Sequence, residues 1–186
     1  VDFKSPGYEW ESFYNGNPIQ KWWKQSIAKT VWEWIPSEDE KLLDIGCGSS
    51  PIISRYRNAI GIDTNLNKLI YMRDKLPHIR FGSSLIGNDY NSILCIELLE
   101  HLSKPEDMIW EITTHLKIGG RVRLATPDYK RPLWAIAEKF TPYKNDHITK
   151  LDRRLLEDMC VTYMLHPVKY KYIAGCDLIE MFEKRI

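Results

Sequence analysis

The sequence predicts a single α/β domain with a Rossmann-like, doubly wound, mostly parallel seven-stranded sheet that ends in an antiparallel β-hairpin. Two observations carry this prediction: short apolar runs alternate with helical stretches along the middle of the chain, and two closely spaced strand-like runs end it. Strands separated by helices form crossover units in parallel sheets, whereas strands joined by a short loop pair antiparallel. The 186 residues are enough for one complete core.

The first 35 residues are unusually rich in aromatic side chains. We expect a helix only from Ile19 to Ile35, where apolar residues recur every three or four positions until Pro36 ends the pattern. Before it, the helix breakers Gly7, Gly16 and Pro18 favour irregular structure.

The remaining elements follow the same alternation. Strand-like runs bounded by turn residues cover 41–48, 58–63, 79–81, 92–96 and 121–126. Helices are expected over 50–57, 65–76, 105–117 and about 131–161. The pair Gly119 and Gly120 reads as the turn that enters the fifth strand. Two further runs, 168–173 and 178–182, are predicted to form the terminal hairpin because only four residues separate them.

Composition excludes several classes of protein. A net charge of +1 gives no global positive field for nucleic acid, so we expect no nucleic-acid partner. The four cysteines lack metal-type spacing, so neither a metal site nor a disulfide framework is expected. No apolar run approaches the roughly 18 residues that cross a bilayer. We therefore expect a cytoplasmic protein, either a monomer or a homodimer.

The segment from Leu42 to Pro51 is a buried strand that runs into a glycine turn and then a helix start. Gly46 and Gly48 allow a sharp bend and a close approach of a ligand to the backbone. The pattern is only G-x-G, so a simple tight turn is an equally good reading. Asp44 favours the ligand reading, because a carboxylate at the strand end suits a cationic group better than a pyrophosphate.

Asp63 ends the second strand. Its separation from Gly46 along the sequence is close to that at which doubly wound folds have an acidic residue that binds ribose hydroxyls. Its two oxygens can accept both hydroxyl protons. The alternative is a helix cap for the stretch after Asn65, although Asn65 can fill that role itself.

Four further motifs follow in order along the chain. They are Ile-Glu-Leu-Leu-Glu-His-Leu (96–102), Lys-Pro-Glu-Asp-Met-Ile-Trp-Glu-Ile (104–112), Leu-Lys-Ile-Gly-Gly-Arg-Val-Arg-Leu (116–124) and Thr-Pro-Asp (126–128). With the glycine turn and Asp63, they make the stretch from Lys41 to Tyr129 resemble a class I S-adenosylmethionine-dependent methyltransferase of the type 11-like small-molecule group.

This resemblance implies S-adenosyl-L-methionine as cofactor and S-adenosyl-L-homocysteine as product. By position in the motifs, the methionine part would be wrapped by Asp44, Gly46, Cys47 and Gly48. Asp63 would hold the ribose, and the adenine would be bordered by Thr64, Asn65, Ser83 and Ser84. Ile96 and Glu97 would line the methyl-donor side. Ser83 stands where many relatives have an acidic residue, so adenine recognition here would depend more on backbone and packing.

Four side chains are candidate proton acceptors for catalysis: Glu97, His101, Asp128 and His147. His101 has a second reading, because it can instead organise the loop after the fourth strand. Asp128 and His147 fall in segments expected above the sheet, where a solvated polar loop is the alternative.

The implied activity is methyl transfer to an oxygen or nitrogen of a small-molecule, lipid or glycan acceptor. The alternative is a catalytically silent cofactor-binding or scaffold protein on the same fold. Within the single domain 1–186 we expect four parts. They are an aromatic N-terminal lid or helix (1–35), a cofactor-binding core (41–129), a substrate-side insertion and helix (130–165), and the terminal hairpin (166–186). Tyr8, Trp10, Phe13 and Tyr14 would form the lid.

Overall fold

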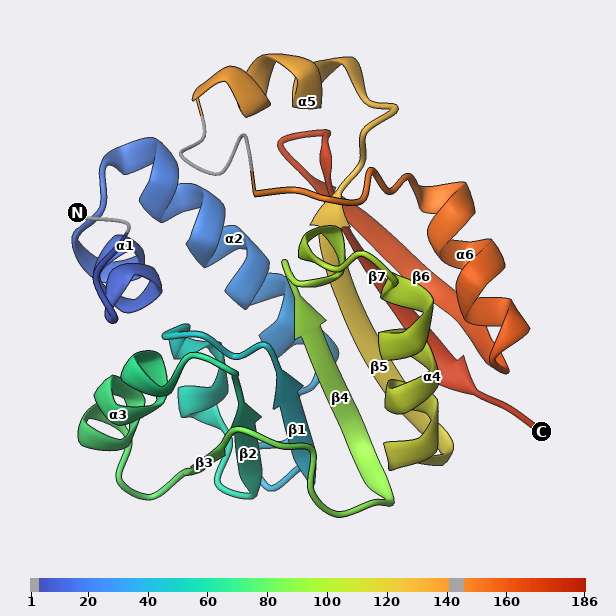
Figure 1. Ribbon diagram of the computed structural model, residues 1–186, viewed down its shortest axis with the longest axis horizontal. Coiled ribbons are helices and arrows are strands. Elements are labelled where there is room, and N and C mark those ends of the chain that lie inside the picture. Colours follow the sequence, from blue (N-terminus) through green and yellow to red (C-terminus); the bar gives the residue numbers. More distant parts are fainter. Residues whose placement is uncertain (1–3, 141–145) are drawn as a thin grey trace. The chain divides into compact units, whose positions relative to one another are not determined.

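The computed structural model describes residues 4–140 and 146–186 (Figure 1). Its seven strands form one sheet in the order β3-β2-β1-β4-β5-β7-β6. This confirms the predicted fold class. The chain divides into two compact units, residues 1–86 and 87–186, and each is described separately below. That all 186 residues fold as one domain stays a prediction.

The first unit holds three parallel strands and its helices. Its elements are α1 (Tyr8–Asn15), α2 (Pro18–Trp34), β1 (Leu42–Ile45), the 3-10 helix η1 (Pro51–Arg55), β2 (Ala59–Ile62), α3 (Leu66–Lys75) and β3 (Arg80–Gly82). β2 pairs in parallel with both β1 and β3, as expected for crossover units. The Asn17 side chain caps α2 by accepting a hydrogen bond of 2.9 Å from Gln20 N–H.

The expectation of irregular structure before Pro18 is wrong, because α1 is a helix of eight residues. Gly7 and Gly16 stand at its two ends, so they bound the helix rather than interrupt it. Glu9 and Glu11 lie in its first turn, where acidic side chains favour helix formation.

The second unit combines parallel and antiparallel pairing. Its elements are β4 (Tyr90–Ile96), η2 (Leu99–His101), α4 (Pro105–His115), β5 (Leu116–Pro127), α5 (Pro132–Ala137), η3 (Glu138–Phe140), α6 (Arg153–Thr162), β6 (Leu165–Ile173) and β7 (Asp177–Lys184). β4 and β5 are parallel, whereas β7 pairs antiparallel with both β5 and β6. The terminal hairpin is therefore confirmed.

Two boundary predictions in this unit are wrong. The stretch expected as one helix over 131–161 contains α5, η3 and a separate α6, with residues 141–145 outside the described chain. Asp152 begins α6 anew, because its carboxylate accepts hydrogen bonds from Arg154 and Leu155 N–H. Gly119 and Gly120 lie inside β5 rather than before it, next to a register shift against β4.

Within residues 4–140 and 146–186, no helix is both long and apolar enough to span a membrane.

Candidate functional site

The glycine turn after β1 has the sharp geometry that the sequence predicts. Gly46 and Gly48 adopt φ values of 71° and 53°, the left-handed region that glycine enters at little cost. The N–H groups of Gly46 and Cys47 donate to the Ile62 carbonyl over 2.8 and 3.0 Å. The turn is thereby fixed to the end of the neighbouring strand β2.

Asp63 holds this turn and the start of α3 together. Its carboxylate accepts hydrogen bonds of 2.8 Å from Gly48 N–H and from Asn65 N–H. Asn65 itself caps α3 by accepting from Asn67 and Lys68 N–H. The helix cap is therefore Asn65, which removes the main alternative role considered for Asp63.

Carboxyl groups are concentrated around the turn. Asp44 is 3% exposed, and burial, with a further contribution from Asp63, raises the pKa of Asp44 to about 8. Burial and then the same two carboxyl groups also raise the pKa of the Cys47 thiol. Because desolvation and like charge both disfavour the anions, a cationic ligand group would be stabilised here.

No sequence pattern indicates the contact of Glu9 with this turn. Glu9, in α1, accepts hydrogen bonds from the side chain and the N–H of Ser49, and pairs with Lys68 Nζ at 2.6 Å. Burial opposes the charged form of Glu9, but Lys68 and Ser49 outweigh it and lower the pKa of this carboxyl. No local pattern reveals a partner 40 residues away.

The other predicted cofactor residues are more peripheral. Thr64, Ser83 and Ser84 are exposed, and Asp63 N–H donates to the Gly82 carbonyl, which places the end of β3 beside that of β2. In the second unit, Ile96 ends β4 and is half-buried. Glu97 follows it with φ 54° and donates its N–H to the Ala125 carbonyl.

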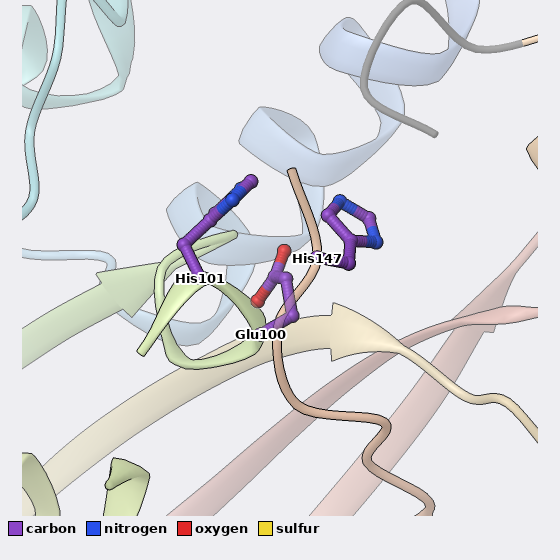
Figure 2. Close-up of side chains that lie close together, drawn as sticks. All are labelled: Glu100, His101 and His147. Carbon is purple, nitrogen blue, oxygen red and sulfur yellow. The ribbon is translucent and has the colours of Figure 1, made fainter. Parts of the chain in front are cut away.

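Three titratable side chains of the second unit lie together beyond β4: Glu100, His101 and His147 (Figure 2). His101 Nδ1 is 2.9 Å from the Asp146 carbonyl oxygen. The Glu100 carbonyl accepts hydrogen bonds from two N–H groups just after His147, those of Ile148 and Thr149. His101 and the Glu100 backbone thus hold the 146–149 segment against η2, whereas proton transfer by His101 stays a prediction.

His147 is enclosed by aromatic side chains. Tyr129 Oη lies 2.7 Å from His147 Nδ1, and the Trp134 ring stacks on the imidazole with centroids 5.8 Å apart and planes at 13°. Burial, with a smaller contribution from His101, lowers the pKa of His147. Burial raises the pKa of Tyr129 to about 12, so this phenol stays protonated at neutral pH.

Asp128 is buried, so it does not belong to a solvated loop. Its carboxylate accepts hydrogen bonds from Lys130 N–H over 3.0 Å and from Tyr172 Oη–H over 2.6 Å. These contacts fix the exit of β5 to strand β6. Asp128 therefore has a structural role in the described chain, and its catalytic role stays a prediction.

Comparison with known proteins places this arrangement in a family. Residues 19–163 match the family described as "Methyltransferase domain". The ubiquinone biosynthesis O-methyltransferase of Dechloromonas aromatica (strain RCB) is 24% identical over 137 residues, which covers 65% of this chain and 56% of that protein. The chain thus spans about half the length of the curated relatives it matches.

Two solved structures share the fold. Magnesium protoporphyrin IX methyltransferase from Synechocystis PCC 6803, with bound SAH, has a TM-score of 0.76 at 14% identity, covering 95% of this chain and 93% of the other. The 1,6-didemethyltoxoflavin-N1-methyltransferase of Burkholderia thailandensis has a TM-score of 0.70 at 13% identity, covering 100% and 93%.

The motifs, the fold and the family match together show that this protein is a class I S-adenosylmethionine-dependent methyltransferase. The chain belongs to the methyltransferase-domain family.

Proposed function

We propose that this protein transfers the methyl group of S-adenosylmethionine to a hydroxyl oxygen of a small-molecule acceptor. The observation that carries the proposal is the Asp63 carboxylate, which joins the left-handed glycine turn after β1 to the start of α3. A ligand that needs a close backbone approach, a ribose acceptor and compensation for positive charge fits these residues.

The chain's residues divide the work of binding. The methionine part would be surrounded by Asp44, Gly46, Cys47 and Gly48. Burial and Asp63 disfavour the ionised form of Asp44, so a positively charged group of the ligand would stabilise that form. Asp63 would accept from the ribose hydroxyls, while Thr64, Asn65, Ser83 and Ser84 would border the adenine. Ile96 and Glu97 would line the methyl-donor side. The bound cofactor supplies an electrophilic methyl group, and the protein holds donor and acceptor in line.

An oxygen acceptor is favoured over nitrogen on two grounds. The relatives that match at 23–25% identity are named as O-methyltransferases. A hydroxyl must also lose its proton during methylation, and the second unit gathers His101 and His147 close together, with ring centroids 4.8 Å apart. Asp128 is less suited to accept that proton, since its oxygens already bind Lys130 N–H and Tyr172.

The test is a screen with methyl-labelled S-adenosylmethionine against small aromatic and aliphatic hydroxyl compounds, amines, lipids and glycans. The proposal expects label on a hydroxyl compound, at a rate that falls in the Asp63→Ala protein. Transfer only to amines would overturn the choice of oxygen. No transfer to any class, despite cofactor binding, would favour a silent cofactor-binding protein instead.

A further inference from the structure

The cluster of Glu100, His101 and His147 has the composition of a metal site. Each residue offers one ligand atom, and these atoms all lie within 4.8 Å of one another. In Figure 2 the Glu100 carboxylate lies between the two imidazole rings. Ligand atoms on a shared tetrahedral zinc ion are about 3.4 Å apart, given bonds of about 2.1 Å, so the widest pair must close by roughly 1.4 Å. His101 is only half-buried, which leaves its side chain room to rotate.

His101 is oriented with its free nitrogen available for a ligand. Its Nδ1 lies 2.9 Å from the Asp146 carbonyl oxygen, which can only accept a hydrogen bond. The proton of a neutral His101 therefore sits on Nδ1, and the lone pair is on Nε2. A backbone carbonyl that fixes the tautomer in this way is the usual outer partner of a metal-binding histidine.

The same logic applies to His147 through a short chain of hydrogen bonds. Tyr129 Oη lies 2.7 Å from His147 Nδ1 and 3.5 Å from Glu138 Oε1, so the phenol proton has two acceptors within reach. When the phenol proton points to Glu138, His147 Nδ1–H donates to the phenol oxygen, and the Nε2 lone pair is available to a metal ion. The stacked Trp134 ring limits rotation of the imidazole on one side.

Glu100 supplies the carboxyl group of the cluster. The residue is fully buried, and its Oε2 accepts a hydrogen bond of 3.1 Å from Thr126 Oγ1. Its Oε1 has no hydrogen-bond partner among the residues that the structure describes. A buried carboxylate oxygen left without a partner is costly, so a cation bound between the histidines would stabilise this position.

We propose that Glu100, His101 and His147 bind one divalent first-row transition metal ion, with zinc-like preference for two imidazole nitrogens and one carboxylate oxygen. Three protein ligands leave at least one coordination position open. This proposal departs from the expectation, drawn from cysteine spacing, that the chain has no metal site.

The catalytic role of the metal ion rests on the proposed methyl transfer. The binding of the ion to Glu100, His101 and His147 does not depend on that function. At the open position the ion would take the acceptor hydroxyl and lower its pKa. As metal ligands, His101 and His147 no longer accept the hydroxyl proton, which passes to water instead. The oxygen forms a bond to the methyl carbon, and the carbon–sulfur bond breaks with its electron pair left on sulfur. The metal ion is unchanged in this balance.

The test uses the full chain, stripped with a chelator and titrated with Co²⁺, which reports its ligands by visible absorption, followed by displacement with Zn²⁺. We expect one ion per chain and at least a tenfold loss of affinity in His101→Ala and in His147→Ala. The control His78→Ala removes an exposed histidine of the first unit and should bind as the unaltered chain does. Glu100→Gln should weaken binding too, provided that its melting curve shows a folded protein.

The outcomes separate the two proposals. Absence of binding, or equal binding by the His101→Ala/His147→Ala double variant, would overturn the metal site while leaving methyl transfer open. Metal binding without any methyl transfer would support the site and count against the proposed function. Transfer that continues unchanged in the stripped protein would overturn the catalytic role of the ion.

Discussion

Asp63 accepts a hydrogen bond of 2.8 Å from Gly48 N–H, and this contact joins the two strongest cofactor signals in the sequence. The same carboxylate holds Asn65 N–H at 2.8 Å. Asp63 therefore shapes the site before any ligand arrives, in addition to its proposed contact with the ribose.

Replacement of Asp63 by Ala should weaken binding of S-adenosylhomocysteine by about 1.5–3 kcal/mol, the range for hydrogen bonds to a charged group. Isothermal calorimetry measures this change. Asp74→Ala, an exposed carboxylate on α3, is the control and should leave affinity unaltered. Since Asp63 also braces the turn, we expect a lower melting temperature in Asp63→Ala, but a folded protein. Unchanged affinity would restrict Asp63 to that structural role.

Asp44 should make stability fall as pH rises. Its folded-state pKa is about 8, against 3.8 for the unperturbed group, so between these values the folded chain keeps a proton that the unfolded chain releases. The free energy of unfolding therefore falls as pH rises, by at most about 1.4 kcal/mol per pH unit. Above the folded-state pKa, Asp44 causes no further decrease.

The measurement is urea denaturation of the unaltered protein and of Asp44→Asn at several pH values from about 4 to about 8. Asparagine cannot titrate, so the variant should gain stability relative to the unaltered protein as pH increases. The difference between the two proteins cancels the other titrating groups. A constant difference across this range would refute a raised pKa of Asp44.

The N-terminal helix should respond to the cofactor. Glu9 of α1 binds Ser49 next to Gly48, so filling of the turn should further restrain residues 8–15. Hydrogen exchange with and without S-adenosylhomocysteine should show added protection there, and Glu9→Gln should reduce it more than Glu11→Gln does. A lid over 1–18 also requires that its deletion lower turnover more than thermal stability. Equal protection in both states would assign α1 to static packing.

If residues 1–186 form one domain, urea should unfold them in a single transition. Five of the seven tryptophans lie in the first unit, and Trp110 and Trp134 lie in the second. Fluorescence of a Trp110→Phe/Trp134→Phe protein reports the first unit alone, and circular dichroism reports the whole chain. Two separate midpoints would contradict the single domain.

Local patterns predicted much of the fold and the cofactor side of the site. The glycine turn, Asp63 and the terminal hairpin all depend on residues close in sequence, where periodicity and turn chemistry are informative. The sequence pattern does not predict helix α1, because Gly7 and Gly16 are typical helix breakers, although here they mark the two ends of the helix. The separate start of α6 was missed because a single capping residue, Asp152, decides it.

Contacts across long stretches of sequence were not predictable in the same way. Glu9 meets Ser49 across 40 residues, and His101 meets Asp146 across 45. The contact between His101 and Asp146 holds the neighbouring His147 close to Glu100. The spacing of these residues along the sequence does not indicate a metal-binding cluster. Such pairs depend on the topology of the folded chain and not on a local motif.

The most direct test of the cofactor assignment is a calorimetric competition between S-adenosylmethionine and S-adenosylhomocysteine, with NAD as the comparison ligand. The glycine turn and Asp63 predict that both sulfur compounds bind one common site, each displacing the other, and that NAD produces no comparable heat. Tight NAD binding, without heat or competition from either sulfur compound, would contradict the assignment of this chain's site to S-adenosylmethionine.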